Sequence, residues 1–406
     1  MTRENIYEEC IHSLKKSNCI LIEAATGVGK SAIALRLINH IFSIPEYRPE
    51  HVPSILLLVA KRVHKQTWKE EIEKWGGVNS KCGHPIIVAE CYESLHKHGG
   101  EKFDIILLDE VHHVASDLRL EALKYIRYNY MIGLSATIPR KLLQYFKYKY
   151  HSEVVSCDII EAIEDDVLPE PEILLFPLVL DNRNTTEQWE YHPKASGPII
   201  HAEFKDYKKY KYKTNIHAFV SCTPKQKNFL FEEEIRQLKS KWETTRSIGI
   251  KNIWLHLAGE RLAFLAYNKN QIVQDILKKL KDYRTITFCK TIEQSEVLGK
   301  YCIHSQNGKA DTIYEAFNQK KINHITSVNI LNENANLVDC KYAVFANITS
   351  SELMTYQRLG RSMRHKSPVI VMPYYKDTRE EEIVNKLLEG FKNKDYIRTI
   401  HSIQEI

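Results

Sequence analysis

Short apolar runs separated by helical patterns dominate the first 150 residues of this 406-residue chain. The runs are Cys19 to Glu23, Ser54 to Ala60, Ile86 to Ala89, Phe103 to Leu108 and Met131 to Leu134. Short buried strands that alternate with helices are typical of βαβ units, which build a parallel sheet covered on both faces. The pattern therefore predicts a doubly wound α/β domain.

The chain has the length of about two domains, at roughly 100 to 200 residues each. An acidic stretch, Glu161 to Asp166, and three prolines that follow it interrupt the strand pattern, so we expect a domain boundary near residue 157. Strand-like runs return at Thr285 to Cys289, His324 to Val328, Tyr342 to Ala346 and Val369 to Met372. The sequence thus predicts one domain over residues 1–157 and a second α/β domain over residues 158–406.

Two further features lie inside the second domain. Residues 181–220 are polar and rich in Tyr and Lys, with turn-forming Asn, Pro and Gly, which favours an insertion that carries a hairpin. Residues 224–283 contain two helical stretches, Pro224 to Trp242 and Lys251 to Tyr283, with leucines and isoleucines near helical spacing. We expect a helical pair there.

Composition excludes several classes of protein. No apolar run approaches the roughly 20 residues needed to cross a bilayer, and no secretory leader is visible, so we expect a cytoplasmic protein. Nine cysteines without regular pairing favour reduced thiols. The group formed by Cys82, His84, Cys91, His96 and His98 lacks zinc-ligand spacing. The net charge of +6 is only a mild bias toward polyanions.

A glycine-containing loop follows the first predicted strand, and a helical pattern begins directly after it. Glycines in such a loop let consecutive backbone N–H groups point at phosphate oxygens, and the helix start adds its positive dipole end. The lysine can reach the β and γ phosphates, and the serine hydroxyl can bind Mg²⁺. The predicted nucleotide-binding residues are Thr26, Gly27, Val28, Gly29, Lys30 and Ser31.

Two adjacent carboxylates, Asp109 and Glu110, come at the end of the strand predicted over Phe103 to Leu108. An acidic residue at the carboxyl end of a parallel strand beside the phosphate loop can hold Mg²⁺. Its neighbour can orient and deprotonate an attacking water. We therefore predict Asp109 as the metal residue, together with Ser31, and Glu110 as the catalytic base.

With these motifs in place, the chain resembles superfamily 2 helicases and translocases, in the DEAD/DEAH-like branch that includes type I and III restriction motors and phage branch-migration helicases. Beyond the phosphate loop and Asp109-Glu110-Val111-His112, the matching segments are Leu58 to Trp68, Cys91 to Leu95, Ser135-Ala136-Thr137, Ile286 to Cys289, Leu331 to Leu337 and Gln357 to Arg364. The resemblance implies two tandem RecA-like domains with a nucleotide cleft between them, ATP and Mg²⁺ as cofactors, and Ser135 and Thr137 as coupling residues.

The segment Gln357 to Arg364 has the pattern Q-x-x-G-R-x-x-R, which is the most discriminating motif of the second half. Its two arginines lie one helical turn apart, so both can present guanidinium groups to one site. In the family that site is the γ-phosphate, so the resemblance implies that Gln357, Arg361 and Arg364 are catalytic. Tyr7 stands where the family often has a glutamine that reads adenine.

Cations near the motifs are candidates for nucleic-acid contacts. Phosphate contacts give affinity without sequence readout, and Lys61, Arg62 and Lys65 are placed to make them. In the insertion, Lys208, Tyr210, Lys211 and Tyr212 interleave cations with aromatic rings, as expected of a backbone-tracking surface. The same alternation fits an exposed edge strand protected by lysines.

The sequence thus favours an ATP-driven motor on nucleic acid, with DNA preferred to RNA and with forks, D-loops or R-loops as substrates. We expect a monomer of phage type, active in the host cytoplasm, with substrate specificity supplied by other proteins. The alternatives are a restriction-complex motor subunit, an RNA helicase and an NTP-switched binding protein. A small-molecule kinase would not need the motif at Gln357 to Arg364, and a degenerate ATPase would be expected to have lost Lys30, Glu110 or Arg361.

Overall fold

In the computed structural model, the described residues are 2–44, 52–328, 337–349, 365–389, 391 and 394–406. Contacts divide the chain into two compact units, each with its own sheet. Among the described residues, the first unit contains those up to Pro171 together with 337–338 and 365–368, and the second unit contains the others. We expected the boundary near residue 157, where strand β6 (Glu153–Cys157) ends. The first unit continues past that point through helix α6 (Ile159–Glu164) to Pro171.

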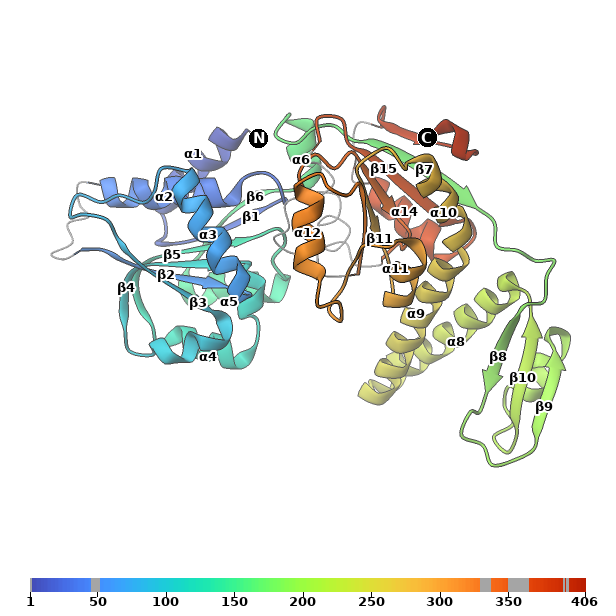
Figure 1. Ribbon diagram of the computed structural model, residues 1–406. Coiled ribbons are helices and arrows are strands. Elements are labelled where there is room, and N and C mark those ends of the chain that lie inside the picture. The colour runs from blue at the N-terminus through green and yellow to red at the C-terminus, as the bar shows by residue number, and fades with distance from the viewer. Residues whose placement is uncertain (1, 45–51, 329–336, 350–364, 390, 392–393) are drawn as a thin grey trace. The chain divides into compact units, whose positions relative to one another are not determined.

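The first unit contains a parallel sheet of six strands among its described residues (Figure 1). The spatial order is β3 (Ile86–Cys91), β2 (Ser54–Val59), β4 (Lys102–Asp109), β5 (Arg127–Ser135), β1 (Cys19–Ala24) and β6. The five predicted strands are all present. Strand β6 escaped prediction because it lies at the sheet edge and only alternate residues, Val155 and Cys157, are buried.

Helices and 3₁₀ turns connect these strands. They are α1 (Arg3–Leu14), α2 (Lys30–Ser43), α3 (Arg62–Lys74), η1 (Tyr92–His98), η2 (Val111–Val114), α4 (Asp117–Lys124), α5 (Arg140–Tyr150) and α6. One core cluster joins apolar side chains of the strands, such as Leu21 and Ile106, to Phe146 of α5. Because all six strands are parallel, their carboxyl ends lie at one edge of the sheet, where ligands of such folds bind.

The second unit contains a seven-stranded sheet within the described residues, and its printed pairings are again parallel. The order is β12 (Cys302–Ile303), β13 (His324–Ser327), β11 (Thr285–Phe288), β14 (Tyr342–Phe345), β15 (Val369–Tyr375), β7 (Glu172–Leu178) and β16 (Ile397–Thr399). The sheet is accompanied by α10 (Asn270–Lys279), α11 (Ile292–Leu298), α12 (Ala310–Asn318), α14 (Arg379–Glu389) and η5 (Ile403–Glu405). The prediction of two α/β halves is confirmed.

An insertion between β7 and α10 carries a small separate sheet and two long helices. Its elements are β8 (Glu187–Tyr191), β9 (Ile199–Glu203), η3 (Phe204–Asp206), α7 (Tyr207–Tyr210), β10 (His217–Cys222), α8 (Pro224–Thr245) and α9 (Ile248–Asn268). Strand β10 is central, antiparallel to β8 and parallel to β9. The consecutive strands β8 and β9 are therefore not neighbours, and η3 and α7 supply the crossover that a parallel pair needs.

The inner face of this small sheet packs on α8 (Figure 1). Trp189 of β8 and Phe231 of α8 meet edge to face, with ring centroids 4.6 Å apart. The second long helix expected from the sequence is divided at Lys269 into α9 and α10. No described helix is long and apolar enough to span a membrane.

Candidate functional site

The phosphate loop links β1 to α2 with the backbone geometry that its glycines permit. Gly27 and Gly29 have φ values of 102° and 98°, a region that L side chains rarely adopt. Gly29 is the N-cap of α2, and no side chain caps the helix there. The first N–H groups of α2 are thus not taken by a capping side chain, which is the arrangement that binds anions at helix starts.

The side chain of Lys30 folds back along this loop. Its Nζ donates a hydrogen bond to the carbonyl oxygen of Ala24 at 2.8 Å. On the outside of the loop, Arg3 Nε of α1 donates to the carbonyl oxygen of Val28 at 2.7 Å, while the Val28 side chain is fully buried. Thr26 and Ser31 are half-buried on the same loop and helix start. The predicted nucleotide-binding residues therefore form one continuous turn at the carboxyl edge of the sheet.

Asp109 ends β4 at that same edge and is held from two sides. Trp68 Nε1 of α3 donates to Asp109 Oδ2 at 2.9 Å, and the Tyr92 hydroxyl donates to the Asp109 carbonyl oxygen at 2.9 Å. Burial raises the pKa of Tyr92 well above its ordinary value, so its hydroxyl remains a proton donor. Trp68 and Tyr92 were not predicted as site residues. They hold Asp109, the predicted metal ligand, in its orientation.

Glu110 is the next residue and lies at the centre of a polar cluster. It is 5% exposed and has a left-handed backbone with φ of 51°. The Ser135 hydroxyl lies 3.1 Å from Glu110 Oε2, and His112 Nδ1 lies 2.9 Å from Ser135 Oγ. Burial opposes the negative charge of Glu110. The hydrogen bond from His112 and the positive charge of Lys30 outweigh it, and together with Ser135 they lower the pKa of Glu110 to about 2.

Ser135 also reaches the segment that follows β5. Its Oγ lies 2.8 Å from the carbonyl oxygen of Thr137, and the Thr137 N–H donates back to Ser135 Oγ at 3.4 Å. A serine hydroxyl has one proton, so it can donate either to Glu110 or to Thr137 at a given moment. One hydroxyl group thus connects the two predicted coupling residues with the predicted base.

The cations expected to contact nucleic acid differ in their surroundings. Lys61 is the N-cap of α3, Arg62 is its first residue, and both side chains are exposed. Lys65 is half-buried and forms an ion pair with Glu90 at 3.1 Å. Lys61 and Arg62 therefore present their charges to solvent, whereas the charge of Lys65 is matched within the unit.

The alternating Lys and Tyr residues that begin at Lys205 start in helical structure, so the interpretation of this run as an exposed edge strand is wrong. Residues 204–210 form η3 and α7, which bring side chains three and four positions apart onto one face. Lys211 consequently points inward, 4% exposed, with its Nζ 3.3 Å from Glu233 and 3.5 Å from Glu234. Lys208 and Tyr212 are exposed, and Tyr210 is half-buried.

The remaining predicted site residues fall elsewhere. Gln357, Arg361 and Arg364 lie outside the described residues, as does most of the segment Leu331 to Leu337. Ile286 to Cys289 forms β11 and its end. Tyr7, in α1, lies under the Arg36 guanidinium at 3.9 Å, and Arg36 in turn binds both oxygens of Glu4. Among the described residues, no group of three or more His, Cys, Asp or Glu side chains is arranged to hold a metal ion.

Sequence families match both units. The family described as type III restriction enzyme, res subunit, matches residues 2–140, and the helicase conserved C-terminal domain matches residues 268–366. A DNA 3'-5' translocase, XPB2 of Sulfurisphaera tokodaii, is 21% identical over 88% of this chain and 77% of that protein. The probable helicase D10 of Escherichia phage T5 is 26% identical over 40% of this chain and 36% of that protein.

Solved structures share the fold. The type ISP restriction-modification enzyme LlaBIII, bound to DNA, matches 99% of this chain and 31% of its own with a TM-score of 0.57 and 12% identity. Dbp5 of S. cerevisiae, bound to RNA and ADP BeF3, matches 94% of this chain and 85% of its own with a TM-score of 0.53 and 12% identity. At such identities the likeness shows the fold alone.

Proposed function

The chain belongs to superfamily 2 of the helicases and translocases, and from this premise we propose that it is an ATP-driven motor that translocates on DNA or remodels it. Forks, D-loops and R-loops are the proposed substrates, in recombination, repair or replication. The match to a DNA translocase supports DNA, and the match to a phage T5 helicase supports a phage-type role in the host cytoplasm.

The observation that carries the proposal is the cluster of Glu110, Ser135 and His112 at the carboxyl edge of the first sheet. Glu110 is buried yet held ionised, and the Lys30 charge contributes to this. A buried carboxylate fixed in this way can orient a water molecule for attack on a terminal phosphate. The Ser135 hydroxyl, shared with Thr137, gives the rest of the first unit a route by which to sense the state of Glu110.

The surrounding residues fit a nucleotide with Mg²⁺. The phosphate loop offers backbone N–H groups at the start of α2, and Lys30 offers an ammonium group that lies beside the loop. Ser31 and Asp109 supply the hard oxygen atoms that Mg²⁺ prefers, and this ion usually takes only one or two protein ligands besides water and phosphate. When bound, the ion would neutralise phosphate charge. Trp68 keeps the Asp109 carboxylate oriented for it.

The second half supplies the remaining catalytic groups of the proposal. We assign Arg361 and Arg364 to stabilisation of the charge that develops on the γ-phosphate, and Gln357 to positioning of the attacking water, on the strength of the sequence motif alone. Arginines in that role contribute about 10³ to 10⁵ in rate in related phosphoryl-transfer systems. Lys61, Arg62, Lys208 and Tyr212 are the proposed exposed contacts to the nucleic-acid backbone.

Steady-state ATP hydrolysis tests the proposal. Wild type, Lys30→Ala and the surface control Lys16→Ala are compared alone and with single-stranded DNA, duplex DNA, forked DNA or RNA. We expect several-fold stimulation by a DNA, absent in Lys30→Ala and retained in Lys16→Ala. Stimulation by RNA alone would replace the DNA motor with an RNA helicase. Robust hydrolysis that no nucleic acid changes would overturn the motor proposal.

A further inference from the structure

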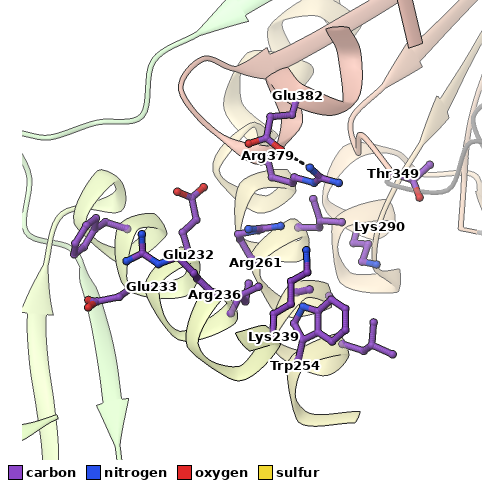
Figure 2. Close-up of a pocket in the computed structure, with 16 residues that line it drawn as sticks. Glu232, Glu233, Arg236, Lys239, Trp254, Arg261, Lys290, Thr349, Arg379 and Glu382 are labelled. Carbon is purple, nitrogen blue, oxygen red and sulfur yellow. Dashed lines mark hydrogen bonds and ion pairs between the residues drawn. The ribbon is translucent and has the colours of Figure 1, made fainter. Parts of the chain in front are cut away.

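A pocket of about 670 Å³ lies within the second unit, between α8, α9, the turn after β11 and α14. Figure 2 shows Lys239 of α8 and Arg261 of α9 directed into the same space, with Lys290 and Arg379 around it. Helix α8 and helix α9 form a hairpin joined by two residues, Arg246 and Ser247, so their facing sides are fixed against each other. One wall of the pocket is therefore made by two consecutive helices.

Arg261 is the most unusual residue of this pocket. Only 8% of the residue is exposed. Its Nε has no hydrogen-bond partner, and no described residue forms an ion pair with its guanidinium. Burial lowers the pKa of Arg261, and the negative charges of Glu232 and Glu382 restore only part of the loss. A buried guanidinium without a partner is costly, so the protein retains it where an anion completes the site.

The nearby carboxylates are already engaged. Glu382 pairs with Arg379, and Glu232 accepts a hydrogen bond from Asn228 Nδ2 at 3.0 Å. Lys239 adds a second cation that forms no ion pair within the described part of the chain. The pocket lining therefore carries more cations than carboxylates, and none of these carboxylates forms an ion pair with Arg261.

An aromatic ring lies beside this charge. Trp254, half-buried on α9, is seven residues before Arg261 and therefore on the same helical face. Its ring is supported from behind by Trp242, with centroids 5.4 Å apart. A supported indole next to a cluster of cations is the combination that binds single-stranded nucleic acid, because the base stacks on the ring while the cations hold the phosphate.

We propose that the pocket around Arg261 binds a phosphate group of a single nucleic-acid strand, with the adjacent base stacked on Trp254. This proposal rests on the motor function proposed above and adds a nucleic-acid contact within the second unit. Arg261 and Lys239 are the principal phosphate ligands. The strand is thereby gripped by the insertion of the second unit, independently of Lys61 and Arg62 in the first.

The test is binding of a short fluorescent single-stranded DNA, measured by anisotropy over a range of salt concentrations without ATP. The variants are Arg261→Gln, Lys239→Gln and the control Lys241→Gln. Lys241 is an exposed lysine of α8 that does not line the pocket, and it lies two residues from Lys239, so it faces another side of the helix. Circular dichroism checks that each variant is folded. Unlabelled inorganic triphosphate is added as a competitor in a separate series.

We expect Arg261→Gln and Lys239→Gln each to weaken binding roughly tenfold, since each loses a hydrogen bond to a charged group. Each is also expected to lower the dependence of log K on log salt by about 0.7, the value for one lost phosphate contact on a single strand. Lys241→Gln should leave both quantities within twofold of wild type. ATP hydrolysis without nucleic acid should be unchanged in all three variants.

Two results overturn the proposal and leave the motor function standing, and a third overturns both. Equal DNA binding by wild type, Arg261→Gln and Lys239→Gln would show that the pocket does not contact the DNA strand, and it would not affect the proposed motor function. Displacement of the oligonucleotide by triphosphate in wild type but not in Arg261→Gln, with unchanged DNA affinity in that variant, makes the pocket a site for free polyphosphate. If wild type binds no nucleic acid at all, the motor function itself fails.

Discussion

Lys269 and Glu380 form an ion pair that is fully excluded from solvent, with 2.6 Å between Lys269 Nζ and Glu380 Oε1. Lys269 is the residue at which α9 ends and α10 begins, and its Nζ also donates to the Pro373 carbonyl oxygen in β15 at 3.1 Å. Glu380 Oε2 accepts from the Tyr375 N–H at 3.1 Å. The pair thus fastens the long helices of the insertion to the end of the second sheet.

Removal of one partner should destabilise the second unit strongly. In Lys269→Met the carboxylate of Glu380 remains buried without its cation, which typically costs about 3 to 5 kcal/mol. The double variant Lys269→Met/Glu380→Gln removes the uncompensated charge and keeps an acceptor for Tyr375, so it should recover part of the loss. Urea unfolding of the full chain, followed by circular dichroism, measures both.

The matched control is Lys278→Met, which breaks an exposed ion pair with Asp275 on α10. Exposed pairs contribute little, so this change should leave the unfolding curve in place. If Lys269→Met unfolded at the same urea concentration as Lys278→Met, the buried pair would have no structural importance. The unfolding of two units need not be a single transition, so the curves are compared rather than converted into one free energy.

The motifs of the first unit could be predicted because the same short segments set the backbone conformation and supply the functional groups. Gly27 and Gly29 require positive φ values, and the strand before them fixes where the loop must lie. The carboxylates Asp109 and Glu110 follow a run of buried residues, so their position at the sheet edge is a consequence of the strand itself. Local sequence is sufficient for such features.

Contacts between distant side chains could not be predicted in this way. Trp68 lies in a segment that matches the family, but its contact with Asp109 spans 41 positions and no local pattern predicts it. Lys211 stands among exposed lysines, yet it is buried because Glu233 and Glu234 lie opposite it on α8. Alternating Lys and Tyr do not by themselves define the conformation, and this segment lies in the crossover that the parallel pair β9 and β10 requires, where it forms η3 and α7.

Substitution of Trp68 should weaken metal binding. In Trp68→Phe the indole N–H that orients Asp109 Oδ2 is lost while the aromatic volume is largely kept. Loss of an outer-shell hydrogen bond typically lowers metal affinity about 10-fold to 100-fold, so the Mg²⁺ concentration for half-maximal ATP hydrolysis should rise by at least tenfold. The control is Trp75→Phe at the end of the same helix, where the indole donates to Glu71. If the Mg²⁺ dependence of ATP hydrolysis were unchanged in Trp68→Phe, Asp109 would not be assigned as a metal ligand.

Substitution of Ser135 should affect turnover more than nucleotide binding. Ser135→Ala removes the hydroxyl shared by Glu110 and Thr137, and a lost hydrogen bond to a charged group costs about 1.5 kcal/mol or more. We expect the DNA-stimulated kcat to fall roughly tenfold, with KM for ATP within twofold of wild type. The control Ser156→Ala removes an exposed hydroxyl from β6. A rise in KM with unchanged kcat would assign Ser135 to nucleotide binding instead.

His324 gives the second unit an acid-sensitive stability. Burial lowers the pKa of His324 to about 4, and its Nε2 lies 3.0 Å from the Thr287 hydroxyl in the adjacent strand β11. The unfolded chain binds the proton near pH 6.5, whereas the folded chain does not bind it until about pH 4. Folded stability should therefore be complete above pH 6.5, fall by up to about 3 kcal/mol as the pH drops to 4, and change no further through this group below that.

Urea unfolding between pH 7 and pH 5.5 measures the upper part of the effect, in a window where few carboxylates titrate. Glu110 does not interfere, because its lowered pKa contributes stability that is lost only as the pH falls below about 4.5 toward 2. His324→Gln removes the titrating ring and should flatten the dependence, whereas His84→Gln, at an exposed position, should leave the slope as in wild type. A slope that persists in His324→Gln would locate the buried titrating group elsewhere in the chain.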